Sequence, residues 1–103
     1  MTEYEFEWDE AKRSEVFAAR GVDILYAALI FEGPVFVKRD DRKDYGEERW
    51  TAIGAVEEQC FVVVYTIRDS AVRLITAWKG GRNDRARYQE RLAVEPQGDV
   101  WPG

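Results

Sequence analysis

The stretch RWTAIGAVEEQCFVVVYTIRDSAVRLITAW, residues 49–78, contains three β-rich runs joined by two short polar links. Links of three residues are long enough only for hairpins, so neighbouring runs must pair antiparallel. The middle run begins at Phe61 with five consecutive apolar residues, which is typical of a strand covered on both faces. The stretch therefore predicts an antiparallel sheet. Its expected strands are residues 49–56, 61–67 and 71–78, with 61–67 at the centre.

The segment before residue 34 has helical patterns. Residues 10–20 contain neither glycine nor proline, and Asp9 and Gly21 are suitable caps for the two ends of a helix there. A second helix fits residues 24–31, where apolar side chains surround most of the circumference and predict burial on several sides. Residues 4–8 alternate apolar and acidic side chains, which indicates a half-exposed edge strand.

The segments on either side of these runs complete the expected fold. Residues 35–38 are also β-rich, and a final helix with Asn83 as its N-cap follows the sheet. Its long apolar side chains are Tyr88 and Leu92, so we expect it to dock loosely. The expected fold class is α+β: an antiparallel β-sheet with two N-terminal helices and one C-terminal helix. A chain of 103 residues supports a single domain, which we place at 1–92, before a C-terminal tail at 93–103.

Composition argues against several classes of protein. The chain has one cysteine, Cys60, which we expect to be a buried thiol, and it has no histidine, so neither a zinc site nor any other metal site or cofactor is predicted. No stretch approaches the roughly 20 apolar residues that span a membrane. The acidic start of the chain is unlike a signal peptide. We therefore expect a cytoplasmic protein without membrane contact.

The positive charge is concentrated near the C-terminus. Residues 73–91 carry six basic and two acidic residues, a local charge of +4, while the whole chain carries −5. Such a separation predicts one surface for a polyanion, and RNA is the polyanion that we favour. The basic residues are Arg73, Lys79, Arg82, Arg85, Arg87 and Arg91.

Aromatic side chains and strand alternation refine this interpretation. Trp78, Tyr65 and Tyr88 could stack on splayed bases, whereas Trp8 and Trp50 are assigned to packing. Strict alternation would place four residues on one face of the last strand, namely Arg73, Ile75, Ala77 and Lys79. It would place Trp78 on the other face. Charged strand residues and single aromatic residues are more often structural, so it is the combination that favours RNA binding.

The missing histidine restricts the mechanism of any cleavage. Metal-free RNA cleavage requires that the 2′-hydroxyl is deprotonated, the leaving 5′-oxygen is protonated and the charge on phosphorus is neutralised. Arginine can perform only the third task, because it does not release its proton. Proton transfer would then fall to Lys12, Lys79, Tyr88 or Glu48, and we expect a slow enzyme.

A series of short motifs resembles the BrnT toxins, ribonucleases of bacterial type II toxin–antitoxin systems with a RelE-like fold. In chain order the motifs are Glu7-Trp8-Asp9 with Lys12, Gly21-Val22, Phe31-Glu32-Gly33-Pro34, Gly46-Glu47-Glu48-Arg49 with Ile53-Gly54, Val63-Val64-Tyr65-Thr66, and Arg73-Leu74-Ile75-Thr76-Ala77 with Arg85 and Tyr88. The resemblance implies growth arrest by RNA cleavage and inhibition by a BrnA-like antitoxin. That antitoxin would carry a ribbon-helix-helix part and bind operator DNA, so that the toxin reaches operator DNA only through it.

The resemblance also bears on the site residues. Lys12, Arg49 and Arg73 match basic positions of the family pattern. The family typically has Lys-His-Gly where this chain has Ala19-Arg20-Gly21, and arginine where it has Trp78. We assign catalytic roles to Lys12, Arg49, Arg73, Lys79 and Tyr88. We assign RNA binding to Arg20, Trp78, Arg82, Arg85, Arg87 and Arg91.

Two alternatives to an active enzyme stay open at this point. If the family histidine transfers protons, Arg20 keeps the positive charge but cannot replace that function. The chain would then be a catalytically inactive toxin-like module that binds its antitoxin and modulates repression of the operon. The other alternative is a subunit of an assembly with no nucleic-acid role.

Overall fold

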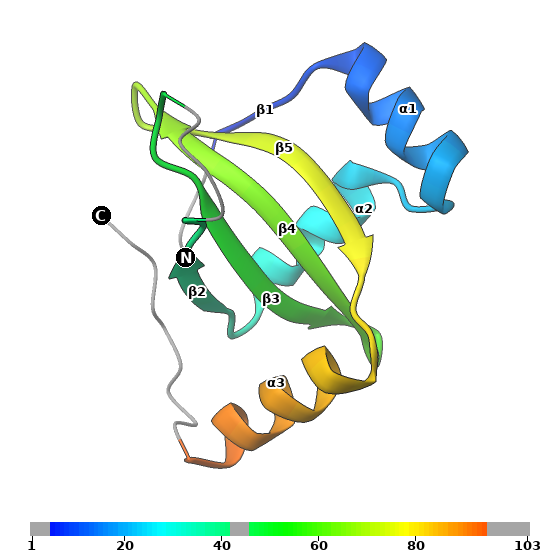
Figure 1. Cartoon of the computed structure of the whole chain (residues 1–103), viewed down its shortest axis with the longest axis vertical. Helices are drawn as coiled ribbons and strands as arrows, with labels where there is room; N and C mark the ends of the chain where they lie inside the picture. Colours follow the sequence, from blue (N-terminus) through cyan, green and yellow to red (C-terminus); the bar gives the residue numbers. More distant parts are fainter. Residues whose placement is uncertain (1–4, 42–45, 95–103) are drawn as a thin grey trace.

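The computed structural model describes residues 5–41 and 46–94, and it contains a five-stranded sheet with helices on both faces (Figure 1). Residues 95–103 of the predicted tail lie outside the described part of the chain. In chain order the elements are β1 (Glu5–Glu7), α1 (Glu10–Arg20), α2 (Ile24–Ala27), the 3₁₀ helix η1 (Ala28–Glu32), β2 (Phe36–Arg39), β3 (Trp50–Val56), β4 (Gln59–Arg68), β5 (Ala71–Lys79) and α3 (Arg82–Val94).

The sheet confirms the predicted α+β fold. Its strand order is β1-β5-β4-β3-β2, so β4 is the central strand, as the apolar run predicts. The pairs β2–β3, β3–β4 and β4–β5 are antiparallel, and the predicted edge strand β1 pairs in parallel with β5. Both central hairpins are closed by two residues with positive φ, Glu57-Glu58 and Asp69-Ser70, a backbone whose twist suits tight hairpins.

The core lies between the sheet and the N-terminal helices. Ile24 of α2 and Ile30 of η1 are fully buried against Val63 and Tyr65 of β4. The Phe31 ring meets the Tyr65 ring edge-on, with 5.5 Å between centroids. Each such large apolar side chain stabilises the fold by about 1.5–3 kcal/mol when it is fully buried. Cys60 is buried, as predicted.

The helix caps follow the sequence prediction, but the second helix does not stay α-helical. The Asp9 carboxylate accepts hydrogen bonds from the backbone of Ala11 and Lys12, and Gly21 adopts a left-handed φ of 69°. The expected helix 24–31 changes after Ala27 into the 3₁₀ helix η1, and Leu29 is 41% exposed rather than buried. The longer rise of a 3₁₀ helix suits the close approach of η1 to β3.

A β-bulge in β5 overturns the predicted alternation of that strand. Val64 of β4 pairs with Thr76, but the next residue, Tyr65, pairs with Leu74, so Ile75 is an extra residue. An extra residue inverts the faces beyond it. The predicted placement of Arg73 and Lys79 on one face, with Trp78 on the other, was therefore wrong.

The register gives the true faces of β5, because directly paired residues share a face. Arg73 pairs with Thr66 and Trp78 pairs with Val62, and both side chains lie on the face opposite the helical core. Lys79 pairs with the core residue Phe61 and so belongs to the other face. Arg73 and Trp78 thus share a face, and Lys79 is separated from both.

Two local predictions are also corrected. Helix α3 begins at Arg82, and the Gly81 carbonyl accepts the Arg85 backbone N–H, so Gly81 rather than Asn83 occupies the capping position. Trp8 does not pack in the core; it is 36% exposed and its indole N–H donates to Glu10. Among the described side chains of α3, Tyr88 alone is buried. This agrees with the predicted loose docking of the helix.

Replacement of Gly54 by alanine is expected to lower the free energy of unfolding by about 1–3 kcal/mol, because the added Cβ would overpack the core. It would lie 2.8 Å from the Ile30 Cβ and 3.0 Å from a Val35 methyl group, atoms of η1 and of the buried segment before β2. Urea unfolding measures the change. Gly33→Ala is the matched control, since nothing lies within 4 Å of its Cβ position. Equal stability of the two variants would contradict the close packing of η1 on β3.

Candidate nucleic-acid interface

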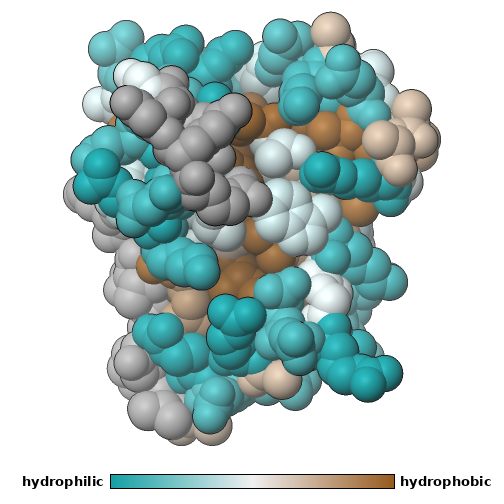
Figure 2. Space-filling view, viewed as in Figure 1, coloured by the Kyte–Doolittle hydropathy of each residue, from teal (hydrophilic) through white to brown (hydrophobic). Residues whose placement is uncertain are grey.

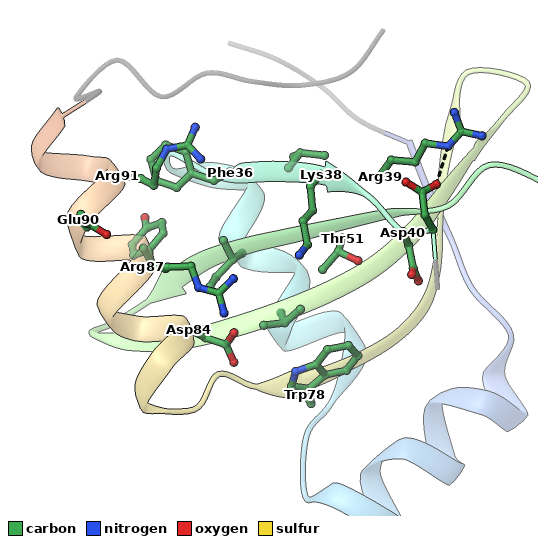
Figure 3. A pocket seen from close by; sticks show the side chains of 15 residues that line it. Phe36, Lys38, Arg39, Asp40, Thr51, Trp78, Asp84, Arg87, Glu90 and Arg91 are labelled. Carbon is green, nitrogen blue, oxygen red and sulfur yellow. Dashed lines mark ion pairs between the residues drawn. The ribbon is translucent and has the colours of Figure 1, made fainter. Parts of the chain in front are cut away.

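A groove of about 870 Å³ lies between α3 and the sheet face opposite the N-terminal helices (Figure 3). Its floor is apolar and aromatic apart from Thr51. Strands β2, β3, β4 and β5 all contribute residues to its lining. Figure 2 shows apolar surface at the centre of this face of the molecule, surrounded by hydrophilic side chains. The floor residues are Phe36, Thr51, Ile53, Val62 and Trp78.

The charged walls of the groove carry both signs. The basic residues are Lys38, Arg39, Arg87 and Arg91, and the acidic residues are Asp40, Asp41, Asp84 and Glu90. Arg39 pairs with Asp41 at 3.2 Å, at one end of the groove. Lys38 and Arg87 instead point from β2 and α3 towards the middle of the groove (Figure 3). The positive charge over the floor therefore comes from these two side chains and from Arg91, which lies over the Phe36 ring.

Arg20, at the end of α1, borders the same face at the outer edge of β5. Its guanidinium donates to the Thr76 hydroxyl and to the Ala77 carbonyl, each at 3.1 Å, and lies 5.5 Å from the centroid of the Trp78 ring. A cation over an indole ring at this distance is attracted by the ring quadrupole. The contacts orient both side chains before any ligand binds.

Four of the six predicted RNA-binding residues meet at or beside the groove. Arg20 and Trp78 lie at its β5 side, and Arg87 and Arg91 line it from α3, with the Arg91 guanidinium 4.9 Å from the Phe36 ring centroid. The remaining two, Arg82 and Arg85, are exposed near the start of α3 and do not belong to the groove lining.

Lys38 was missed by the sequence prediction. It lies in the short edge strand β2, where a charged residue usually only protects an edge. Its register partner is Thr51, so its side chain shares the groove face. Only the pairing of β2 with β3 reveals this position, and no local signal in the sequence could have found it.

The predicted catalytic residues are not brought together in one cluster. Lys12 is exposed on α1, 3.7 Å from Glu15. Lys79 lies at the far end of β5 from Arg73, about 20 Å away at the usual rise per strand residue. The basic segment 73–91 therefore does not form one continuous patch, because its charges are distributed along the whole strand and around α3.

Arg49 and Arg73, in contrast, reach the same end of the sheet. Thr66 pairs with Arg73, and its hydroxyl donates to the carbonyl of Glu48, the residue before Arg49, at 2.6 Å. Each arginine has an acidic partner: Arg73 lies 3.6 Å from Glu7 and Arg49 lies 3.2 Å from Glu47. Such half-exposed ion pairs contribute about 0–1 kcal/mol. A phosphate could therefore compete for either arginine.

Tyr88 is placed by packing and by a hydrogen bond. Its hydroxyl donates to the Pro34 carbonyl at 2.9 Å, and its ring lies 5.4 Å from the Phe36 ring. Burial raises the pKa of the Tyr88 hydroxyl, so this group retains its proton more firmly than an ordinary tyrosine. These contacts favour a packing role, in which Tyr88 holds α3 over the groove.

Residues 5–41 and 46–94 offer neither a cluster of metal ligands nor a helix that could span a membrane. No group of three or more His, Cys, Asp or Glu residues there could hold a metal ion. No helix in the same residues is long and apolar enough to cross a membrane.

The fold and the groove define a small α+β domain with a cleft that has an aromatic floor and walls of both basic and acidic side chains. The family model of the BrnT ribonuclease toxins of type II toxin–antitoxin systems matches residues 8–84, and the chain belongs to this family. The resemblance in the sequence motifs is thereby confirmed. Membership implies ribonuclease activity, an RNA substrate and a cognate antitoxin. A search of curated proteins found no match.

The matched segment ends in the first turn of α3. It includes Arg20, Lys38, Arg49, Arg73 and Trp78, and of the α3 residues that line the groove it includes only Asp84. The strand residues of the groove therefore lie within the matched segment, and the α3 residues after Asp84 lie beyond it.

Replacement of Tyr88 by phenylalanine is expected to lower the free energy of unfolding by about 0.5–1.5 kcal/mol, the contribution of one hydrogen bond. RNA cleavage by the folded variant should remain at the level of the parent, because the hydroxyl bonds a carbonyl in the protein. Thermal unfolding and an RNA cleavage assay measure the two effects. A large loss of cleavage without a loss of stability would instead restore Tyr88 as a catalytic group.

Proposed function

We propose that this protein is a metal-independent endoribonuclease toxin that binds a single strand of RNA along the groove face of its sheet. The observation that carries the proposal is the convergence of four side chains from four elements. Arg20 of α1, Lys38 of β2, Trp78 of β5 and Arg87 of α3 all lie at or beside this groove. Cations hold phosphates, and an exposed ring face stacks on a splayed base with about 1–3 kcal/mol per base.

The β5 register extends the proposed RNA path to the other end of the sheet. Arg73 shares the face of Trp78, and Arg49 lies at the same sheet end as Arg73. A strand that stacks on Trp78 and continues along β5 would place a phosphate between these two arginines. Lys79 faces the other side of the sheet, and Lys12 is exposed on α1, so neither side chain is on this path.

The proposed reaction is an internal transesterification. The ribose 2′-hydroxyl gives its proton to water, and its oxygen attacks the adjacent phosphorus. The bond from phosphorus to the 5′-oxygen breaks, and the leaving oxygen takes a proton from water, so that a 2′,3′-cyclic phosphate and a 5′-hydroxyl are formed. The arginines stabilise the additional negative charge on the phosphorane. Because the chain has no histidine and arginine does not exchange its proton, we expect turnover to be slow.

A second candidate function is supported by the ion pairs of the phosphate-holding arginines. Arg73 and Arg49 are each engaged by an acidic residue, which lowers the positive potential at that end of the sheet. A protein with this arrangement could bind its antitoxin and modulate operon repression without cleaving RNA. Expression of the parent protein alone separates the two functions, since only the enzyme arrests growth.

Replacement of Arg73 by alanine should remove phosphorane stabilisation of about 2–4 kcal/mol, by analogy with the loss of one oxyanion donor. Cleavage should then fall roughly 30-fold to 1,000-fold, and induced expression should no longer arrest growth. Growth curves and primer extension on cellular RNA measure the effects. Lys79→Ala is the charge-matched control, since Lys79 faces the other side of the sheet and lies off the proposed RNA path. A folded Arg73→Ala protein that arrests growth like the parent would assign Arg73 a structural role.

The same cleavage assay tests the chemistry. EDTA should leave the rate unchanged, and the products should carry a 2′,3′-cyclic phosphate. Loss of cleavage in EDTA with recovery on addition of Mg²⁺ would contradict the proposed mechanism. A 2′-deoxy nucleotide at the cleavage position should abolish the reaction, because it lacks the attacking oxygen.

The cognate antitoxin is proposed to be a BrnA-like ribbon-helix-helix protein that covers the basic groups around α3 with acidic residues and so competes with RNA. Association should be fast at low salt and slow at high salt, because exposed charges are screened beyond about 8 Å at physiological ionic strength. The variant with Arg82→Glu and Arg85→Glu should associate more slowly than the parent, with a weaker salt dependence. Rates that respond to neither change would place the antitoxin on another surface.

A further inference from the structure

Helix α1 positions Arg20 beside Trp78, but few of its side chains pack against the rest of the protein. Val16 is the one buried side chain among its residues. Arg13, Val16 and Arg20 are three and four residues apart, so they lie along one face of the helix over two turns. Two arginines and one valine therefore make up the inward stripe of α1.

The first of these arginines binds the beginning of the next helix. Arg13 Nε donates to Asp23 Oδ1 and Arg13 Nη2 donates to Asp23 Oδ2, both at 2.9 Å. Asp23 Oδ1 also accepts the backbone N–H of Leu25 at 3.0 Å, so the same carboxylate caps α2. Glu10 adds a longer contact with Arg13 at 3.3 Å. The hydrogen bonds from Arg13 lower the pKa of Asp23, and the pair is therefore ionised at neutral pH.

The second arginine reaches the RNA-binding face. Arg20 is about 10 Å from Arg13 along the helix axis, and it bonds Thr76 and Ala77 at 3.1 Å beside Trp78. A tilt of α1 by about 10° around Val16 would displace Arg20 by about 1 Å. Such a displacement takes bonds of this length out of the range of good hydrogen bonds.

We propose that Arg13 and Asp23 are a positioning pair for RNA binding, which holds α1 at the angle that keeps Arg20 over Trp78. The inference rests on the proposed function, because it assumes that the Arg20–Trp78 contact borders the RNA path. Arg13 and Asp23 touch no RNA in this scheme. They act only through α1, whose one buried side chain is Val16.

A double-mutant cycle tests the coupling of the two arginines. The probe is a fluorescein-labelled single-stranded 2′-O-methyl RNA, which cannot be cleaved, and fluorescence anisotropy gives its dissociation constant. Arg20→Ala should weaken binding about tenfold, and Arg13→Ala should weaken it roughly three- to fivefold, by the usual strength of charged hydrogen bonds. The double variant should bind like Arg20→Ala alone, because the pair has nothing left to position.

Two further variants keep the test independent of folding. Asp23→Asn removes the charge that Arg13 binds but retains a good N-cap for α2, and it should reproduce the effect of Arg13→Ala. Ser14→Ala changes an exposed residue of the same helix and should bind RNA like the parent. Thermal unfolding of each variant confirms that the protein is folded at the temperature of the binding assay.

The outcomes separate this inference from the proposed function. Additive losses in the double variant, or unchanged binding in a folded Arg13→Ala protein, would overturn the positioning role while Arg20 stays in the interface. Unchanged binding in Arg20→Ala would contradict the proposed RNA path itself, and the inference with it. Loss in both single variants without further loss in the double variant supports the pair.

Discussion

The extra residue at Ile75 is the constraint on which the interface depends. Side chains of a strand alternate strictly between faces, so a regular β5 could not bury both Leu74 and Ala77 in one core. The bulge resolves this conflict: Val72 and Leu74 face the core before it, and Ala77 faces the core after it. As a consequence, Arg73 and Trp78 both emerge on the opposite face. Packing of the core thus places both side chains on one face of the sheet, with Trp78 in the groove beside α3 and Arg73 at the other end of β5.

The shortness of β1 completes this arrangement at the sheet edge. It pairs only with Ala71, Val72 and Arg73, so within the described part of the chain the later part of β5 has a neighbouring strand, β4, on one side only. Arg20 covers this open edge by donating to the Ala77 carbonyl, and the same side chain lies against Trp78. Arg20 therefore both protects the edge of β5 and orients Trp78 on the proposed binding surface. An arginine suits both roles because its planar group donates several bonds and stacks on aromatic rings.

The interface combines a firm sheet with a lightly held helix. Four strands form its floor through continuous hydrogen-bonded pairing, whereas α3 is held mainly by Tyr88, which contacts Phe36 and the Pro34 carbonyl. The basic side chains that line the groove come equally from β2, with Lys38 and Arg39, and from α3, with Arg87 and Arg91. Without histidine, such a site can neutralise phosphate charge well but transfers protons poorly. For this reason the proposed cleavage of RNA is expected to be slow.

The sequence by itself determined the hairpins, the central strand β4, the caps of α1 and α2 and the buried Cys60, because periodicity, turn length and capping are local properties. Its ordered motifs also identified the family. The tertiary structure alone decided the bulge at Ile75, the separation of Lys79 from Arg73 and the position of Lys38 in the groove. Arg20 and Trp78 meet although they are far apart in the chain. Register depends on how two strands pack across a sheet, and no pattern within one strand records that choice.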